Sequence, residues 1–383
     1  MDKDAVIYVA GHRGLVGSAL LRHLQGLGYR NLLTRTRAEL DLTDQAAVRD
    51  FFAAQRPDHV LLAAAKVGGI EANQSYPAQF IRDNLVIQTN VIHSAYQFGV
   101  KRLLFLGSSC IYPRDCPQPI RESYLLTGPL EPSNRPYAVA KIAGIEMCWS
   151  YNRQYGTRFL AVMPTNLYGP GDNYHLRDSH VIPAMIRKFH LAKLSRTGDL
   201  AGIIADEQRH GPIPPEIKEM LGFRPDQPLT AAARPQAPPV VRLWGTGTPR
   251  REFLYSADLA AACVFLLTLA DRNFAALLGS KEEDQTFAPP LINIGCGQDL
   301  TIRQLAALVQ EVVGYEGEVV FAAAGLDGTP RKLLDISRLG QLGWRPQTSL
   351  PAGLAAAYRD FVSGGELTRS GGVTAADQKV ELP

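Results

Sequence analysis

The chain has 383 residues, of which 46% are hydrophobic and 20% are charged, values typical of a globular protein large enough for two domains. A net charge of +3 does not indicate a nucleic-acid or membrane partner, and no apolar run reaches the roughly 18 residues that a spanning helix requires. The five cysteines lack CxxC spacing, which argues against a disulfide framework or a zinc site and favours a reducing compartment, so we expect a cytoplasmic protein.

The first predicted strand, residues 5–10, leads directly into Gly-His-Arg-Gly-Leu-Val-Gly at residues 11–17. A helix with apolar residues at 20, 21, 24 and 27 follows. Between a strand and a helix, such glycines allow a tight turn and close approach of a pyrophosphate to the helix N-terminus. We therefore predict a dinucleotide site formed by Gly11, His12, Arg13, Gly14, Leu15, Val16 and Gly17.

The second predicted strand, residues 31–34, indicates which dinucleotide binds. A site for NAD usually has an acidic residue about 20 positions after the glycines, which accepts a hydrogen bond from the ribose 2′-hydroxyl. Here the strand ends in Arg35-Thr36-Arg37, and the glycine loop carries Arg13. Guanidinium groups pair with a 2′-phosphate, so Arg13 and Arg37 favour NADP(H). We also expect cofactor contacts from Asp41 and Leu42.

Strands and helices continue to alternate. The predicted elements are a helix at 44–54, a strand at 59–63, a helix from about 77 to 98, a strand at 103–106, a helix at 137–155 and a strand at 159–163. This spacing predicts an α/β fold with a doubly wound parallel (Rossmann) sheet, whose strand carboxyl ends bind ligands. Further cofactor contacts are expected there from Leu106, Gly107, Ser108, Ser109, Pro164, Thr165, Asn166 and Leu167.

Beyond residue 172 the pattern changes. We expect residues 1–172, with about 250–265 and 291–313, to form the NADP-binding domain. A smaller, discontinuous substrate domain is expected from 173–249 and 314–362. Asp258 is predicted to be the N-cap near the start of an Ala-rich helix. Residues 195–239 are rich in proline and lack periodicity, so they are interpreted as a weakly structured insertion with one short helix at 215–221. Residues 363–383 are expected to be a disordered tail.

Three residues suggest proton transfer to a carbonyl group. Ser108 ends a predicted buried strand, and Tyr137 and Lys141 are spaced i, i+4 on one helix face. A nearby ammonium is expected to lower the pKa of Tyr137 toward the range that general acid catalysis favours. Taken alone, Tyr-x-x-x-Lys also fits an ordinary amphipathic helix, and only the glycine motif shifts the interpretation toward a reductase.

Cys110 and His180 suggest a second reaction. Cys110 lies two residues after Ser108, so both side chains would share one face of an extended segment. A thiol with a pKa of about 8.5 and an imidazole of about 6.5 bracket neutral pH, which suits removal and return of a proton beside a ketone. The alternatives are a buried apolar cysteine and a structural histidine.

Together these segments resemble the extended short-chain dehydrogenase/reductases and, within them, the GDP-L-fucose synthase family of 3,5-epimerase/4-reductases. The motifs are residues 11–17, Leu-Gly-Ser-Ser-Cys-Ile-Tyr-Pro at 106–113, Met-Pro-Thr-Asn-Leu-Tyr-Gly-Pro at 163–170 and Ser-His-Val-Ile-Pro at 179–183. The resemblance runs from about residue 4 to 362, interrupted at 195–239.

The resemblance implies a role for each of these side chains. Cys110 would be the epimerase base and His180 the acid, with His180 also beside the cofactor. Tyr137 would protonate the C4 oxygen during reduction by NADPH, while Lys141 holds the nicotinamide ribose and Ser108 bonds the carbonyl oxygen. The long helices near 77–98 and 137–155 resemble the family's dimer-forming pair, so a homodimer is implied.

A GDP-sugar substrate would need cations for its diphosphate. The candidates are Lys188, Arg251 and Lys332, with Arg187 and Arg250 as neighbours. Trp244 would stack on the guanine or pack beside it, and Asp327 would either hold a sugar hydroxyl or form a turn. Lys188 stands where the family pattern leads us to expect arginine, which keeps the charge but loses a bidentate clamp.

Three other functions remain open. A 4,6-dehydratase needs an acidic residue beside the strand-end hydroxyl, and residues 108–110 contain none. A simple 4-epimerase has no need for the Cys110 and His180 pair. A non-catalytic NADP-binding scaffold would bind the cofactor without oxidising it in the presence of any nucleotide sugar.

Overall fold

The centre of the molecule is a six-stranded sheet in which all neighbouring strands are parallel. The computed structural model describes residues 1–230, 232–279, 290–322 and 329–365. In spatial order the strands are β2 (Leu32–Leu33), β1 (Ile7–Ala10), β3 (His59–Leu62), β4 (Arg102–Leu106), β5 (Phe159–Pro164) and β9 (Leu291–Ile294). The chain moves outward from β1 first to β2 and later through β3, which confirms the predicted doubly wound sheet.

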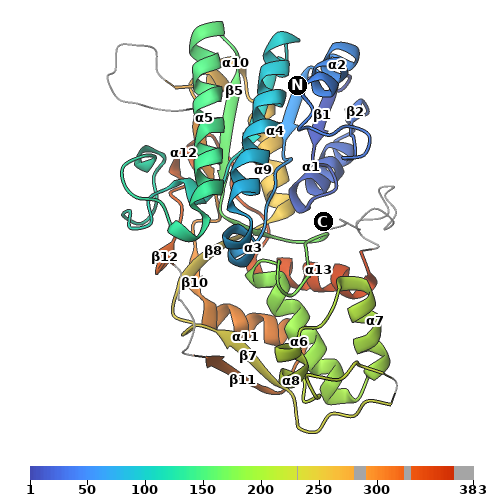
Figure 1. Cartoon of the computed structure of the whole chain (residues 1–383). Helices are drawn as coiled ribbons and strands as arrows, with labels where there is room; N and C mark the ends of the chain where they lie inside the picture. The colour runs from blue at the N-terminus through green and yellow to red at the C-terminus, as the bar shows by residue number, and fades with distance from the viewer. Residues whose placement is uncertain (231, 280–289, 323–328, 366–383) are drawn as a thin grey trace.

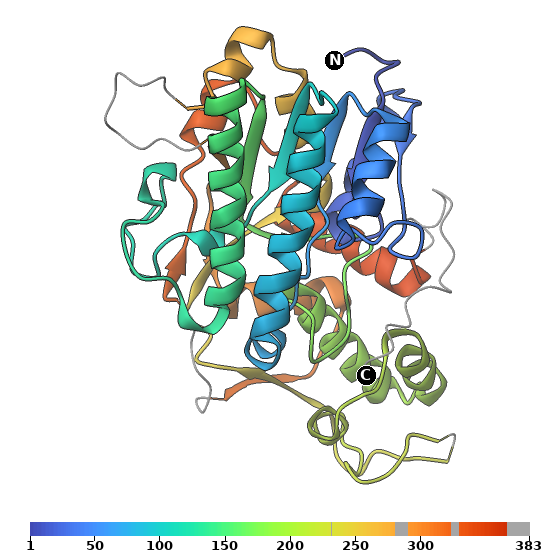
Figure 2. The same ribbon diagram turned by 45° about the horizontal axis from the view of Figure 1, so that its top comes forward.

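Helices cover both faces of this sheet (Figure 1, Figure 2). The helices on one face are α2 (Gln45–Gln55), α4 (Pro77–Gln97) and α5 (Arg135–Tyr155). Those on the other face are α1 (Leu15–Gly26), α9 (Ser256–Thr268), α10 (Asp271–Ala275) and α12 (Ser337–Gln341). Each face has its own hydrophobic core, which explains why the strands are continuous apolar runs.

A third hydrophobic core forms a smaller unit, below the sheet in Figure 1. Its helices are α6 (Val181–Thr197), α7 (Leu200–His210), α8 (Pro215–Met220), α11 (Ile302–Val313) and α13 (Leu350–Ser363). They pack with the parallel strands β7 (Val240–Trp244) and β11 (Glu318–Ala322). Helix α11, which we expected to belong with the sheet, contacts α6 and α13, and we propose to assign it to the smaller unit.

The segment 195–239 is more ordered than the sequence indicated. Helix α8 confirms the short helix predicted at 215–221, whereas α7 was not predicted. Ile203, Ile217 and Phe223 from this segment are buried in the third core. The expectation of weak structure was therefore wrong for residues 200–210, where α7 packs against α6, but the described residues between 223 and 239 form no helix or strand.

The N-terminus of α9 also differs from the prediction. Tyr255 is the N-cap residue, and Asp258 lies inside the first turn. The Asp258 carboxylate instead accepts a hydrogen bond from the backbone nitrogen of Thr348 at 2.9 Å. The carboxylate therefore makes a tertiary contact that the local sequence does not reveal.

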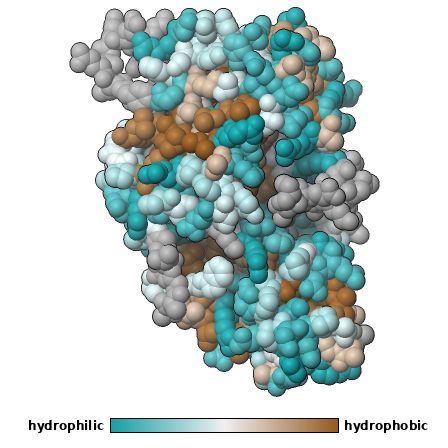
Figure 3. Space-filling view, viewed as in Figure 1, coloured by the Kyte–Doolittle hydropathy of each residue, from teal (hydrophilic) through white to brown (hydrophobic). Residues whose placement is uncertain are grey.

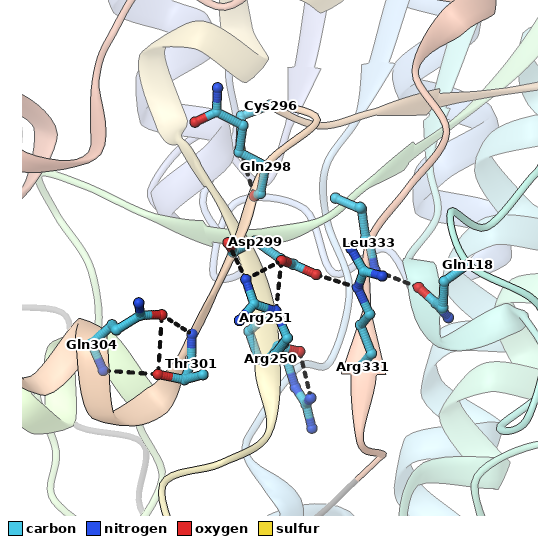
Figure 4. A network of polar contacts seen from close by, with 10 residues as sticks. All are labelled: Gln118, Arg250, Arg251, Cys296, Gln298, Asp299, Thr301, Gln304, Arg331 and Leu333. Carbon is cyan, nitrogen blue, oxygen red and sulfur yellow. Dashed lines mark hydrogen bonds and ion pairs between the residues drawn. The ribbon is translucent and has the colours of Figure 1, made fainter.

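A small sheet joins the two units. It contains β10 (Asp299–Thr301), β8 (Arg250–Tyr255) and β12 (Arg331–Lys332), and β6 (Asn166–Tyr168) pairs with β8. Asp299 on β10, whose side chain is nearly fully buried, accepts hydrogen bonds from Arg250 on the adjacent strand β8 and from Arg331 on β12, the strand beyond it (Figure 4). One carboxylate thus ties three strands together.

Two half-buried histidines in the smaller unit predict acid sensitivity. His190 contacts the hydroxyl of Tyr358 at 3.0 Å, and His210 stacks on Phe361. Burial lowers the pKa of His190 to about 4 and that of His210 to about 3. Both rings are neutral in the folded protein but titrate near 6.5 when unfolded, so their stabilising effect is complete above pH 6.5 and is lost as pH falls below it.

We expect the free energy of unfolding to fall by about 1–3 kcal/mol between pH 7 and pH 5, allowing for the partial exposure of both rings. Urea unfolding at the two pH values measures it. In the double variant His190→Asn/His210→Asn the fall should be smaller, and an unchanged fall would assign it to other groups.

Candidate active site

The glycine loop between β1 and α1 is shaped by close packing. Gly11 has a φ of +82°, and a Cβ there would lie 2.7 Å from the backbone nitrogen of Ala64. A Cβ on Gly17 would lie 2.1 Å from the carbonyl oxygen of Gly11. Gly14 is the N-cap of α1, where the nearest atom to such a Cβ is 3.6 Å away. Two glycines are therefore needed for packing, and the third leaves the helix N-terminus open to a pyrophosphate.

A cavity of about 800 Å³ opens beside this loop. Its charged and titratable lining residues are His12, Arg13, Tyr29, Arg30, Arg35 and Glu39. Arg37, which we predicted to bind a 2′-phosphate, is not among the residues that line the cavity. Its side chain is 79% exposed and forms an ion pair with Asp41 at 3.5 Å. The geometry favours Arg35 beside Arg13 for this role, and the contribution of Arg37 stays a prediction.

Asp41 and Leu42 lie in the turn before α2. The Asp41 carboxylate accepts hydrogen bonds from the backbone nitrogen and the hydroxyl of Thr43. The carbonyl oxygen of Leu42 accepts one from the side chain of Asn90 at 2.9 Å. These bonds hold the turn in place, and a cofactor contact from either residue stays a prediction.

The segment after β4 does not stay extended. Residues Ser109–Ile111 form a 3-10 turn, and Ser108 is its N-cap, with its Oγ accepting from the backbone nitrogen of Cys110 at 3.4 Å. The expectation that Ser108 and Cys110 share one face of an extended segment was therefore wrong. The turn nevertheless keeps the Cys110 thiol near enough to Ser108 for that side chain to lower the thiol pKa.

Helix α5 brings Tyr137 and Lys141 to the same place. The Lys141 Nζ donates a hydrogen bond to the carbonyl oxygen of Leu106, the last residue of β4, at 2.8 Å. It also lies 5.7 Å from the centroid of the Tyr137 ring. A Cβ on Gly107 would lie 2.2 Å from the Met163 side chain, so the glycine allows the ends of β4 and β5 to approach. Ser108, Cys110, Tyr137 and Lys141 thus converge at the carboxyl end of β4.

Burial dominates the acid–base properties of this cluster. It raises the pKa of Tyr137 above its usual value and lowers the pKa of Lys141 to about 8. The expectation that Lys141 lowers the pKa of Tyr137 was wrong for this structure, because desolvation of the phenol outweighs the ammonium that Leu106 already engages. Burial also raises the pKa of the Cys110 thiol, and Lys332 acts most strongly in the opposite direction. At neutral pH the phenol therefore keeps its proton.

His180 is the N-cap residue of α6. The loop before it is tied to the segment after β3 by a hydrogen bond from the Gly69 nitrogen to the Asp178 oxygen at 3.3 Å. His180 keeps an exposed surface, but the protein around its imidazole lowers its pKa by desolvation. Within the described part of the chain, no measured contact joins His180 to Cys110, so their pairing stays a prediction.

The predicted cofactor segment 164–167 follows β5. The side chains of Thr165 and Asn166 both donate to the carbonyl oxygen of Glu252, at 3.2 and 2.9 Å. Glu252 is fully buried. Its carboxylate accepts hydrogen bonds from the backbone nitrogens of Cys296, Gly297 and Leu334. Glu252 therefore links this segment to β8 and to the residues that follow β12.

The predicted diphosphate cations lie on three elements. Lys188 on α6 has its Nζ 5.1 Å from the ring centroid of Trp244, and that tryptophan is 71% exposed. Arg251 and Lys332 are register partners on the adjacent parallel strands β8 and β12. Burial lowers the pKa of Lys332. Asp327 lies outside the described residues.

Two neighbouring arginines are engaged elsewhere. Arg187 is fully buried and pairs with Asp206 at 2.7 Å. It also donates to the backbone carbonyls of Tyr174, His210 and Gly211. Arg250 pairs with Asp299 (Figure 4). Arg187 is enclosed by its own partners, and the partly exposed Arg250 is engaged by Asp299, so a diphosphate contact from either stays a prediction.

Sequence reasoning overlooked two residues that shape the site. Arg35 was passed over for Arg37, although it is nearer the strand end, lines the cavity, and interacts through its backbone with the glycine loop residue His12. Glu252 is a charged residue directly before the apolar pair Phe253 and Leu254 in a strand. An acidic side chain at such a position signals a buried polar contact, because a charge is buried only when it has partners.

Comparison with known proteins identifies the family. The model of the NAD dependent epimerase/dehydratase family matches residues 7–203 and 227–276, which is more than half of the chain. The chain belongs to this family. The Arabidopsis thaliana protein named GDP-L-fucose synthase 1 is 50% identical to this epimerase/dehydratase, with 93% of each chain covered.

Two further relatives are also named as enzymes that act on GDP-sugars. The Escherichia coli GDP-L-fucose synthase is 50% identical, with 94% of this chain and 98% of the relative covered. Among solved structures, MlghC, a GDP-mannoheptose C4 reductase from Campylobacter jejuni with NADP bound, is 37% identical, with a TM-score of 0.76. The superposition covers 95% of this epimerase/dehydratase and 99% of MlghC.

Two other properties of the described residues bear on the chemistry. None of the helices in the described ranges is both long and apolar enough to cross a membrane. In the same part of the chain, no cluster of three or more His, Cys, Asp or Glu side chains is placed to hold a metal ion. The five cysteines are all free thiols.

Proposed function

We propose that this epimerase/dehydratase converts GDP-4-keto-6-deoxy-D-mannose to GDP-L-fucose, by inverting C3 and C5 and then reducing C4 with NADPH. The observation that supports this most directly is the position of Cys110, which contacts Ser108 beside Tyr137 and Lys141. A reductase alone needs only the last three residues. The two named relatives at 50% identity carry the same activity in their names.

NADP(H) is the proposed cofactor. The residues present fit it: the open N-terminus of α1 suits the pyrophosphate, and Arg13 and Arg35 line the neighbouring cavity. MlghC, the solved relative, holds NADP. When bound, NADPH supplies the hydride that reduces C4. Ser108 would hold the C4 carbonyl oxygen, and Lys141 the nicotinamide ribose.

Tyr137 would complete the reduction by giving its phenolic proton to the C4 oxygen. Because burial raises its pKa, the phenol is protonated throughout the neutral range and is ready to donate. Lys141, whose pKa is about 8, lies next to the ring and can support the phenolate that remains. The proton that restores the phenol then comes from solvent.

The C4 ketone makes the hydrogens on C3 and C5 acidic. For each inversion, the Cys110 thiolate would take a proton from one face of the carbon, and the His180 imidazolium would return one to the opposite face. Burial disfavours both the thiolate and the imidazolium, and the nearby Lys332 and Lys141 favour the thiolate. The supporting structural fact is the thiol beside the carbonyl-binding Ser108.

Substitution of Cys110 by serine tests this assignment. We expect Cys110→Ser to lose C3/C5 proton exchange with deuterated solvent, by about 10²-fold or more. A serine hydroxyl is much less acidic than a thiol, so it supplies almost none of the anion that would remove the proton. Exchange is measured by mass spectrometry of the GDP-sugar, beside NADPH oxidation. Cys116→Ser, at the half-buried neighbouring cysteine, is the matched control and should exchange normally.

Each outcome separates the candidate functions. Unchanged exchange in Cys110→Ser would remove the role given to Cys110. Reduction without any exchange in the unaltered protein would favour a C4 reductase, which is the activity in the name of MlghC. Binding of NADP without NADPH oxidation by any nucleotide sugar would favour the scaffold.

We further propose a homodimer formed through α4 and α5 and a cytoplasmic location. Hydrophobic surface gathers over this face of the molecule (Figure 3), and Tyr76, Val139 and Tyr155 are among its exposed apolar side chains. The free thiols suit a reducing compartment. A molar mass in solution near that of one chain, 41.8 kDa, would contradict the dimer.

A further inference from the structure

The segment 204–226 lies outside the two stretches that match the family model. It is nevertheless firmly attached to the substrate side of the molecule. The buried guanidinium of Arg187 binds the Asp206 carboxylate and two backbone carbonyls of this segment, those of His210 and Gly211. Arg187 immediately precedes Lys188, the candidate diphosphate cation. The segment is therefore held in place by Arg187, the residue next to the proposed substrate-binding Lys188.

Helix α8 of this segment packs against β7, the strand that ends in Trp244. Glu219 on α8 forms an ion pair with Arg242 on β7 at 3.3 Å. Arg242 and Trp244 are two residues apart in the strand, so their side chains point to the same face. Both are exposed there. The ion pair therefore shows that the face of α8 carrying Glu219 is turned toward the face of β7 that carries Arg242 and Trp244.

Glu216 lies on that same side of α8. It precedes Glu219 by three residues, and positions i and i+3 are neighbours on one helix face. Where Glu219 reaches Arg242, Glu216 reaches the next part of the site: it acts electrostatically on Lys188, favouring its charged form. The Lys188 ammonium in turn lies over the Trp244 ring. Side chains of α6, α8 and β7 therefore interact in one region: Glu216 with Lys188 through charge, and Lys188 with the Trp244 ring.

We propose that Glu216 is a specificity residue that recognises the guanine base of the nucleotide sugar. The inference rests on the proposed function. With Lys188 directed to the diphosphate and the base against Trp244, the Glu216 carboxylate accepts hydrogen bonds from the ring N1–H and the 2-amino group of guanine. These are two adjacent donors, and a carboxylate offers two adjacent acceptors.

The same geometry excludes other bases. Adenine has an unprotonated N1 and no 2-amino group, so its edge would place an acceptor against the carboxylate. Hypoxanthine keeps the N1–H but lacks the amino group. A site built to bond a particular donor discriminates strongly against an analogue that lacks it, because its own polar atoms are left unpaired. We therefore expect affinity to decrease from GDP to IDP to ADP.

The experiment measures the dissociation constants of GDP, IDP and ADP by titration calorimetry on the full chain in the presence of NADP. The variants are Glu216→Gln and Glu216→Ala, and Glu219→Gln is the matched control on the same helix. We expect Glu216→Gln to weaken GDP by about tenfold and ADP by much less, so that the ratio of the two affinities falls. Glu219→Gln should leave all three ligands unchanged.

Two outcomes would overturn the inference. An equal loss for GDP and ADP would mean that Glu216 acts only through the charge of Lys188. Unchanged affinities in both Glu216 variants would remove it from the site. Failure of the proposed function looks different. In that case the unaltered protein would not oxidise NADPH with GDP-4-keto-6-deoxy-D-mannose, whatever its relative affinities for GDP, IDP and ADP.

Discussion

Replacing Tyr137 by phenylalanine is expected to lower the rate of NADPH oxidation by about 10²- to 10⁴-fold, the usual contribution of a positioned general acid. The substitution removes only the hydroxyl, and the ring keeps its edge-on contact with Phe80 at 6.3 Å between centroids. The fold and the affinity for NADP should therefore remain. Single-turnover oxidation of NADPH, followed by absorbance, measures the chemical step.

The matched control is Tyr151→Phe. Tyr151 lies on the same helix, but its hydroxyl contacts His93 at 2.8 Å, away from the end of β4. Its loss should leave the rate within a factor of a few. If Tyr137→Phe turned over as fast as the unaltered protein, another group or water would have to protonate the C4 oxygen.

Replacing Arg187 by methionine is expected to reduce the free energy of unfolding by about 3–5 kcal/mol, the usual cost of removing one partner of a buried ion pair. The change leaves the buried Asp206 carboxylate without its cation. It also removes the donors that the carbonyls of Tyr174, His210 and Gly211 now accept from. The shift of the urea midpoint and its slope measure the loss.

A second variant separates the charge from the packing. In Arg187→Met/Asp206→Leu the unpaired carboxylate is gone, so part of the lost stability should return. The recovery should be incomplete, because the three backbone carbonyls still lack donors. If Arg187→Met kept full stability but had a higher KM for the GDP-sugar, Arg187 would instead belong to the diphosphate site.

The secondary structure of the sheet could be predicted because its signals are local. The run at residues 103–106 and the glycines at 11–17 each specify a strand or a turn through neighbouring residues alone. In the smaller unit this failed for α7, where Ile203 is buried against other elements rather than within a long amphipathic pattern. Such a helix is stabilised by tertiary packing, which periodicity does not record.

Side chains were predicted less well than elements. The arginines illustrate the reason: Arg37 was chosen over Arg35 for the cofactor, and nothing in the sequence indicated that Arg187, next to Lys188, is enclosed in the core. The structure shows Arg35 lining the cavity and Arg37 exposed, and it shows Arg187 enclosed by its own partners. A single residue step rotates a side chain to a different face, and only the partners brought there by folding decide what it does.

The order of residues by itself determined the parallel sheet, the dinucleotide loop, the hydroxyl and thiol that follow one strand, and the phenol and lysine on one helix face, because each depends on short-range spacing. Only the tertiary structure decided the protonation states of these side chains and the partners of the nearby charged residues. Burial keeps the Tyr137 phenol protonated and makes Lys141 a weaker base, although their spacing suggested that the lysine would acidify the phenol. Desolvation depends on everything that surrounds a side chain, and most of those atoms come from distant parts of the chain.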